Sequence, residues 1–299
     1  MNIQLTKALF AAPLLALALN GCNDSTTGTS SGTGTLNLAV TDAPIDDALQ
    51  VWVEFTGIEL KPSGGTSVDI DFATAKRINL LSLQGTDFDS LLSGQSVSSG
   101  SYSWMRLKVN AEQSTQDSYV VTSTGAHSLY IPSGSETGLK LHNPFTILGG
   151  TTHDLTIDFD LRKSVHQPQG VVSDYVLKPS LRLLQDTLAG HISGTVPTTQ
   201  ASDTDCAGAV YAFEGSDVTP TDEGPTTPNP VSTALVKLNT ESGDYEYEIG
   251  FLERGNYTIA FTCEADQDEP TTDDTIAFLD NANAAVTAGQ TTTHNFPTP

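Results

Sequence analysis

Asp158, Asp160 and Arg162 occupy alternate positions in the stretch DLTIDFDLRKSV, in which apolar and polar residues also alternate. On a β-strand these side chains share the polar face, with neighbours about 7 Å apart. Carboxylates at that separation could form an acid–base pair or a set of metal ligands. A nearby arginine lowers the pKa of a carboxyl group, which suits a structural ion pair better than a general acid. We therefore predict an ion-pair ladder that joins the two carboxylates to Arg162 and Lys163 and fixes strand register.

Two acidic stretches contain enough oxygen ligands to begin a calcium site. The stretch TDAPIDDA holds Asp42, Asp46 and Asp47 just after a predicted strand. The stretch CEADQDEPTTDD holds Asp266 and Asp268, but it lacks the glycine of an EF-hand loop. Each stretch also has a simpler interpretation, a capped turn for the first and a solvated acidic loop for the second. A Ca²⁺ cofactor is therefore a hypothesis at both places.

The first cysteine follows an apolar run that stops abruptly. The run from Ala8 to Leu19 is too short to span a hydrocarbon core of about 30 Å, but it fits a secretory signal peptide. The residues LNGC that end at Cys22 resemble the lipobox of bacterial lipoproteins. This resemblance implies a signal peptide over residues 1–21, a lipid on Cys22 and sorting to the outer membrane. The alternative is a secreted protein with an incidental cysteine.

The residues after Cys22 are rich in Gly, Ser and Thr and have no apolar surface to bury. Residues 22–33 are therefore predicted to form a flexible tether. In an oxidising compartment the remaining cysteines, Cys206 and Cys263, are predicted to form a disulfide. Two buried free thiols are the alternative.

The net charge of −23 limits the classes of partner. Lys237 and Arg254 are the only basic residues after position 189, whereas half of the 36 acidic residues lie there. A surface of this sign repels phosphate backbones, so nucleic acid is excluded as a partner class. The sequence also lacks catalytic motifs. The residues GTSSG at 28–32 have the letters of a nucleophile elbow, but they lie in the tether with no strand or helix beside them. We predict a protein that is not an enzyme.

Alternating apolar residues predict an all-β fold of two tandem β-sandwich domains, at residues 34–187 and 190–299. Only FDSLLSG and DAPIDDALQ are expected to make helical turns. The stretch from Glu214 to Thr233 has four prolines and no apolar periodicity, so it is predicted to be a long exposed loop. The clearest predicted strands are TLNLAVT, LQVWVEFTGIEL, SWMRLKV, DLTIDFDLRKSV and, after residue 190, HISGTV, AVYAF, YEYEIG, NYTIAFT and DTIAFL.

The first predicted domain resembles the bacterial lipoprotein family of domain of unknown function 4382. The matching stretches are LNLAVTDAPIDDALQVWVEFTGIEL, GSYSWMRLKV, IDFDLRKSV and YVLKPSLRLL. The second domain resembles carboxypeptidase-regulatory-like and transthyretin-like β-sandwich modules through ISGTV and FLERGNYTIAFT. The first family implies no activity, and modules of the second kind imply an accessory or adhesive role.

We therefore expect a protein anchored to the outer membrane through Cys22, with a non-catalytic binding, adhesion or structural role. Its location makes an envelope protein or a polysaccharide the expected kind of partner. The acidic stretches allow a calcium-dependent adhesin as the first alternative. The second is an exported hydrolase acting on envelope polymers, because residues that are distant in the sequence can still converge in a fold.

Overall fold

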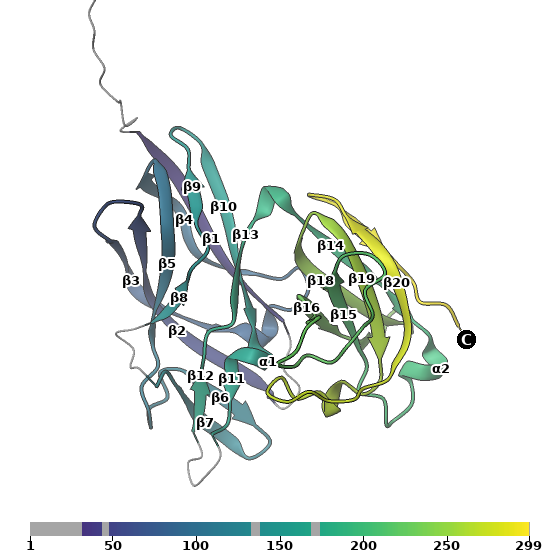
Figure 1. Ribbon diagram of the computed structural model, residues 1–299. Coiled ribbons are helices and arrows are strands. Elements are labelled where there is room, and N and C mark those ends of the chain that lie inside the picture. Colours follow the sequence, from purple (N-terminus) through teal and green to yellow (C-terminus); the bar gives the residue numbers. More distant parts are fainter. Residues whose placement is uncertain (1–31, 44–47, 133–137, 169–173, 299) are drawn as a thin grey trace, which may run out of the picture. The chain divides into compact units, whose positions relative to one another are not determined.

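Two β-sheets built from residues before 186 enclose the first hydrophobic core (Figure 1). The computed structural model describes residues 32–43, 48–132, 138–168 and 174–298, and all of them belong to one compact unit. The smaller sheet has the strand order β13–β10–β1–β4, in which β1 is parallel to β10 and antiparallel to β4. Its strands are β1 (Thr33–Ala43), β4 (Asp89–Ser98), β10 (Thr152–Asp160) and β13 (Leu181–Gln185).

The larger sheet has nine strands, with β2 and β5 paired at its centre. Its strands are β2 (Gln50–Pro62), β3 (Val68–Asn79), β5 (Gly100–Asn110), β6 (Tyr119–Thr122), β7 (Gly125–Tyr130), β8 (Leu139–Leu141), β9 (Phe145–Ile147), β11 (Val165–His166) and β12 (Tyr175–Leu177). Short helices interrupt the two sheets at η1 (Leu80–Ser82) and α1 (Leu161–Ser164).

The alternation in the sequence correctly predicted which side chains face this core. Leu36, Leu38 and Val40 of β1 are buried, and so are Met105 and Leu107 of β5. Because side chains alternate across a strand, the polar residues between them lie on the outer faces. The stretch YVLKPSLRLL alternates like a strand but contains Pro179, which predicts an edge strand or two short strands, and it forms two short strands, β12 and β13.

Helical turns were expected in two stretches of this part of the chain. One expectation was wrong, and the other falls partly outside the described residues. The stretch FDSLLSG forms most of β4 and makes no helical turn, because its backbone pairs with β1. In DAPIDDALQ, residues 44–47 lie outside the described residues. The strand β10 also departs from simple alternation, since Thr156 and Asp158 on its predicted outer face are buried.

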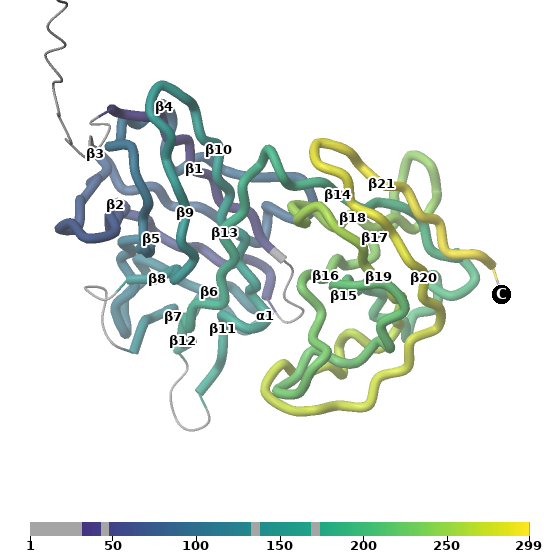
Figure 2. Tube along the Cα trace, turned by 45° about the horizontal axis from the view of Figure 1, so that its top comes forward, coloured from purple at the N-terminus to yellow at the C-terminus, as the bar shows by residue number. Residues whose placement is uncertain are grey.

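Two further sheets hold the strands after residue 188 and enclose a second core around Ile192, Ile249 and Phe261 (Figure 2). The sheet β17–β18–β14–β21 contains β14 (Ala189–Val196), β17 (Lys237–Leu238), β18 (Tyr245–Glu253) and β21 (Thr291–Thr293). The sheet β16–β15–β19–β20 contains β15 (Ala209–Glu214), β16 (Ser232–Leu235), β19 (Gly255–Thr262) and β20 (Phe278–Val286). The short helices here are η2 (Asp186–Leu188), α2 (Thr198–Ala201) and η3 (Ala265–Gln267).

The architecture is thus all-β, as predicted. In two of the sheets the described strands all precede η2 in the sequence, and in the other two they all follow it. The domain boundaries at 187–190 stay a prediction. The stretch DTIAFL is a strand only from Phe278 onward.

The loop between β15 and β16 differs from its prediction. It has no strand or helix, as expected, but Asp222 and Glu223 in its middle are buried. The loop is therefore not exposed throughout, and its buried part carries charge.

Candidate functional site

Arg162 lies at the centre of a buried group of charged and polar side chains. Its side chain is 5% exposed. Its Nη1 donates to the Tyr211 hydroxyl at 2.8 Å and to the Asp268 carboxylate at 3.3 Å. Its Nη2 donates to the backbone carbonyl oxygens of Ala265 at 2.8 Å and of Asp268 at 2.7 Å. The guanidinium thus uses its fork of donors on both carboxylate and carbonyl acceptors.

The position of Arg162 corrects the predicted ladder. The strand β10 ends at Asp160, whose carboxylate caps α1 by accepting a hydrogen bond from the Lys163 amide at 3.1 Å. The chain therefore leaves the strand before Arg162, and the arginine does not continue the polar row. Asp158 pairs instead with Arg182 of β13, whose Nε lies 3.1 Å from its Oδ2, and Asp160 pairs with Lys163 at 3.2 Å. Of the predicted ladder, only the pair of Asp160 with Lys163 is present, whereas Asp158 pairs with Arg182 and Arg162 lies elsewhere.

Glu223 completes a group that we call the Arg162 cluster, which consists of Arg162, Lys163, Tyr211, Glu223 and Asp268. The Oε1 of Glu223 lies 2.6 Å from the Lys163 Nζ, and the Oε2 of Glu223 lies 3.6 Å from Arg162 Nη1. Its backbone amide donates to the Asp268 carboxylate at 3.1 Å. Burial and the nearby Asp160 raise the pKa of Glu223 to about 8, although the two cations act in the opposite direction.

Sequence reasoning missed Tyr211 and Glu223. Tyr211 reads as an ordinary apolar residue of a strand, and Glu223 as one of many acidic loop residues. Tyr211 donates its hydroxyl proton to the Asp268 carboxylate, and burial raises the pKa of Tyr211. No local pattern identifies either residue, because their partners come from distant segments of the chain.

The Arg162 cluster connects four segments: α1, β15, the turn around η3 and the buried part of the loop between β15 and β16. Asp268 exposes none of its side chain, and Glu223 exposes 4%. Each charge is paired with another charge of the cluster, and Lys163, with 26% of its side chain exposed, is the most accessible of the charged members. Removing one partner from such a cluster is costly because a buried charge is left uncompensated. The arrangement is therefore one of structural connection.

The predicted disulfide between Cys206 and Cys263 is confirmed. It lies next to the turn that accepts Arg162, because the Ala207 amide donates to the carbonyl of Cys263 at 2.9 Å. The Ala265 amide in turn donates to the carbonyl of Ala207 at 3.2 Å. The disulfide therefore holds in place the backbone that carries the acceptors of Arg162.

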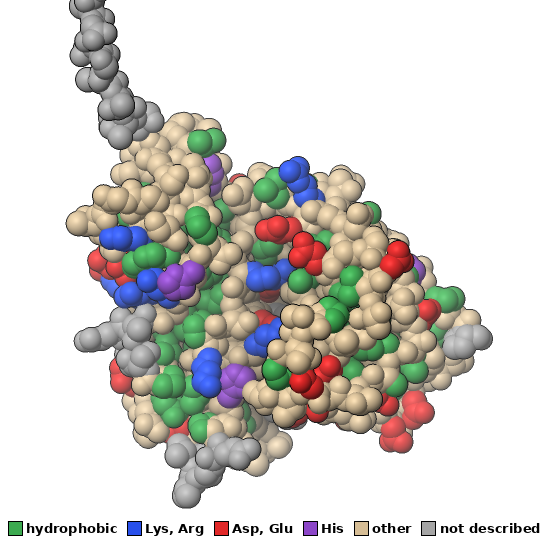
Figure 3. All heavy atoms as spheres, viewed as in Figure 1, with side chains coloured by type: hydrophobic (Ala, Val, Ile, Leu, Met, Phe, Trp, Pro, Cys, Tyr) green, Lys and Arg blue, Asp and Glu red, His purple; other side chains and the backbone are tan. Residues whose placement is uncertain are grey.

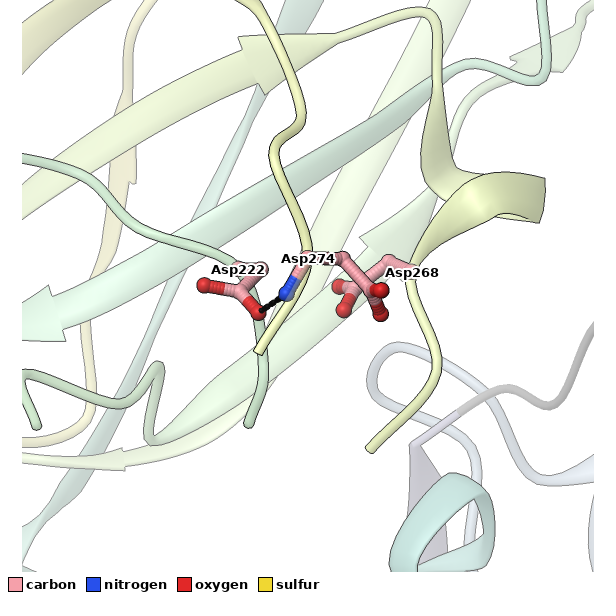
Figure 4. A group of neighbouring side chains, drawn as sticks. All are labelled: Asp222, Asp268 and Asp274. Atoms are coloured by element: carbon pink, nitrogen blue, oxygen red, sulfur yellow. Dashed lines mark hydrogen bonds between the residues drawn. The ribbon is translucent and has the colours of Figure 1, made fainter. Parts of the chain in front are cut away.

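Figure 4 shows the group of acidic side chains whose arrangement comes nearest to that of a metal site. Carboxylate oxygens of Asp222, Asp268 and Asp274 lie within 4.8 Å of one another. Of the two predicted ligands, Asp268 belongs to this group and Asp266 does not. Asp268 already accepts from Tyr211 and Arg162, and Asp222 accepts from the backbone amide of Asp274. Burial raises the pKa of Asp268, and these donors partly offset that effect. Internal donors thus occupy both oxygens of Asp268 and one oxygen of Asp222.

The other predicted calcium site is only partly described. Asp42 lies at the end of β1 in line with the apolar row of that strand and is 4% exposed. Neither of its carboxylate oxygens has a hydrogen-bond partner in the described part of the chain. Burial, followed by the charges of Asp158 and Asp160, raises the pKa of Asp42 well above its usual value. Asp46 and Asp47 lie outside the described residues.

Ion pairs also line the outer face of the larger sheet. Arg77 lies 2.6 Å from Glu54, and Arg106 lies 3.1 Å from Glu59 on neighbouring strands. These pairs are partly solvated, so each contributes little to stability. On the face drawn in Figure 3, the acidic side chains over the second pair of sheets are scattered and do not gather in one patch.

Residues 33–179 match the family model described as "Domain of unknown function (DUF4382)". This match supports, for about half of the chain, the family to which its sequence motifs pointed. No curated protein matches the chain. Cys22 lies outside the described residues, and in the part that is described no helix is long and apolar enough to cross a membrane.

The structure is weakly similar to several solved structures. The TIE protein of Bacillus anthracis is 10% identical with a TM-score of 0.20, and the alignment covers 89% of this chain but 34% of that one. The minor pilin GBS52 of Streptococcus agalactiae is 9% identical with a TM-score of 0.21, covering 88% of this chain and 97% of that one. The major pilin subunit BcpA of Bacillus cereus is 11% identical with a TM-score of 0.21, covering 88% and 98%. Similarity at this level carries no functional argument.

Proposed function

We propose that this protein is a lipid-anchored component of the bacterial outer envelope with a non-catalytic role in binding, adhesion or structural support. The signal-like residues 1–21, the lipobox-like LNGC and the Gly/Ser/Thr-rich residues 22–33 support the anchor. Several acyl chains on Cys22 give a durable attachment, since each buried methylene contributes about 0.8 kcal/mol. We further propose domains at 34–187 and 190–299, the second of them an accessory β-sandwich module.

The observation that supports the non-catalytic role is that the charged side chains of the Arg162 cluster are paired with one another inside the protein. A catalytic acid or base must come within hydrogen-bond reach of its substrate. Arg162 and Asp268 of the cluster expose 5% and 0% of their side chains. Their hydrogen bonds all go to other parts of the chain, so these groups hold segments together. An envelope protein or a polysaccharide is the partner class that this role and location favour.

The anchor is tested by growing bacteria that express the full chain with a clickable fatty-acid analogue. We expect the label on the protein and its loss in Cys22→Ser, which removes the acylated sulfur. Ser25→Ala in the tether is the matched control and should keep the label. A protein that stays unlabelled and soluble with residues 1–21 uncleaved contradicts the proposal.

Calcium dependence is the second candidate and is favoured by the approach of Asp222, Asp268 and Asp274 to within 4.8 Å. A cation that binds only the folded state stabilises that state, and the stabilisation grows with the logarithm of the cation concentration above Kd. Thermal unfolding in Ca²⁺ and in chelator distinguishes the two roles. Equal melting temperatures remove the calcium-dependent adhesin from consideration.

A further inference from the structure

A polar groove of about 510 Å³ lies along the sheet β17–β18–β14–β21. Figure 2 shows these four strands together. Gln84 and Gly85, from the loop before β4, form one wall of the groove, and Leu235 and Leu238 also line it. The volume lies in the range of small-ligand sites, which is about 300–1,000 Å³.

The strand register brings the polar lining residues onto one face of the sheet. Thr195 stands opposite Glu246, which stands opposite Lys237 on the next strand. In a second row, Ser193 stands opposite both Glu248 and Thr293. Residues directly opposite one another share a face, and neighbouring strands are about 4.8 Å apart. The floor of the groove is thus a grid of hydroxyl, carboxylate and ammonium groups.

The charged members of this grid are already paired, whereas the hydroxyl groups are not. Lys237 donates to the Gln84 side chain, and Thr86 donates to Glu248 at 3.3 Å. Asn239 donates to Glu246 at 3.0 Å. Within the described residues, by contrast, the hydroxyl groups of four lining residues have no hydrogen-bond partner: Ser193, Thr195, Thr233 and Thr293.

Thr233 is the most informative of these four. It is 6% exposed, and its buried Oγ1 has no partner in the described part of the chain. A buried polar atom without a partner is costly, and few such atoms occur in native proteins. Thr233 thus marks an unsatisfied polar position beside the wall of the groove, although its Oγ1 is itself buried.

The chemistry of the groove selects one class of ligand. An anion is repelled by Glu246 and Glu248, and an apolar ligand cannot satisfy the free hydroxyl groups. A peptide strand pairs with a sheet edge, whereas this groove runs over a sheet face. A neutral glycan offers hydroxyl groups that both donate and accept, together with C–H faces that can pack on Leu235 and Leu238. We propose that the groove binds a short neutral glycan. This inference rests on the proposed non-catalytic binding role and names its ligand class.

The wall of the groove is held in a fixed position. A Cβ atom at Gly250 of β18 would lie 1.8 Å from the Gly85 carbonyl oxygen, so strand and loop are in close backbone contact. The bond from Thr86 to Glu248 joins the same loop and strand, and the bond from Lys237 to Gln84 joins that loop to β17. A site whose walls are fixed in advance loses less conformational entropy when it binds.

The test uses the full chain, purified in a detergent without a sugar headgroup, and isothermal titration with three neutral trisaccharides. The probes are maltotriose, cellotriose and triacetylchitotriose, with spermine and trigalacturonate as cationic and anionic comparisons. We expect a Kd of about 1 mM or tighter for at least one neutral probe. Ser193→Ala and Thr195→Val should each weaken binding about 2- to 10-fold, the effect of one lost hydrogen bond.

Thr291→Val is the matched control, since Thr291 is an exposed residue of β21 that does not line the groove. It should leave the affinity unchanged, and thermal unfolding checks that each variant is folded. The inference is overturned if no neutral trisaccharide binds, if spermine or trigalacturonate binds in its place, or if the groove variants bind as tightly as the parent chain. Labelling at Cys22 is read separately, so a failed titration with a labelled protein rejects the glycan site and leaves the envelope role standing.

Discussion

Asp42→Asn should stabilise the protein at neutral and alkaline pH, although it removes a charged residue from a protein interior. Asp42 is 4% exposed and in register with Phe159, and neither of its oxygens has a hydrogen-bond partner among the described residues. Ionisation at this place is unfavourable because the carboxylate loses its hydration and gains no donor. The charges of Asp158 and Asp160 add to that cost.

The sign of the pH dependence follows from proton linkage. The pKa of Asp42 is raised well above its usual value in the folded state, so the folded protein binds this proton more tightly than the unfolded chain does. Stability from the protonated group is complete below the unfolded pKa and is lost as pH rises toward the folded pKa. The loss is at most about 1.4 kcal/mol per pH unit inside that window.

Between pH 5 and pH 7 the parent chain should therefore lose stability relative to Asp42→Asn, by at most about 3 kcal/mol over these two pH units. Relaxation around the site reduces this figure, so we expect a difference of about 1–3 kcal/mol at pH 7. For a chain of this size that difference corresponds to a shift of about 2–10 °C in melting temperature. Thermal unfolding of both proteins at half-unit steps from pH 4 to pH 9 measures the gap.

Other buried carboxylates also titrate, so the quantity to follow is the difference between the two proteins at each pH. Asp244→Asn is the control, since Asp244 is exposed in the turn before β18. Its melting temperature should follow that of the parent chain. A gap between Asp42→Asn and the parent that stays constant with pH, or a variant that is the less stable protein at pH 8, refutes the reasoning.

Four further variants test the rest of the structure. Arg162→Met should lower the free energy of unfolding in urea by about 3–5 kcal/mol, because it leaves buried carboxylates without a cation. The control Arg77→Met, on the exposed sheet face, should lower it by less than about 1 kcal/mol. Equal losses in the two variants would contradict the structural role of the Arg162 cluster. Replacing Cys206 and Cys263 by serine removes the disulfide between residues 57 apart in sequence and should lower the free energy of unfolding by about 4 kcal/mol. An unchanged urea midpoint would show that the disulfide contributes nothing to stability. Gly250→Ala should lower stability by about 1–3 kcal/mol, since its new methyl group meets a loop carbonyl oxygen, and an unchanged thermal midpoint would contradict that contact.

The strands were predictable because most of them bury one face and leave the other in solvent. Leu36 and Leu38 on β1, and Met105 and Leu107 on β5, recur at every second residue and are all buried. A period of two is the direct consequence of strand geometry, so it can be read without knowing the partners of a strand. Pro179 inside the alternating stretch YVLKPSLRLL predicted an edge strand or two short strands, because proline cannot donate to a neighbouring strand, and two short strands are present.

The pattern failed where a second layer covers the polar face. In β19 the residues Thr258 and Thr262 are 1% and 0% exposed, although they alternate with larger apolar residues as an outer face would. Asp158 of β10 is buried in the same way. Whether an outer face meets water depends on segments that pack there later in the chain, and alternation within one strand carries no information about them.

The Arg162 cluster could not be predicted for a related reason. Residues at alternate positions share a face only while the strand continues, and β10 ends when Asp160 caps α1. A single change in backbone direction therefore moved Arg162 from the expected polar row to Tyr211 and Asp268, which lie 49 and 106 residues away in sequence. Glu223 gave no signal at all, because an acidic residue in a proline-rich loop is normally solvated.

The use of cations in this fold explains how its large negative charge is accommodated. Arg162, Lys163 and Arg182 all pair with buried carboxylates, so they do little to neutralise the acidic groups that remain at the surface. With 36 acidic and 13 basic residues, the surface keeps a strong negative potential. Such a surface repels anionic lipid headgroups and nucleic acid, so an anionic ligand is disfavoured at any exposed groove. The polar groove carries Glu246 and Glu248 in its floor, so the charge of the whole molecule and the local chemistry disfavour an anion there for the same reason.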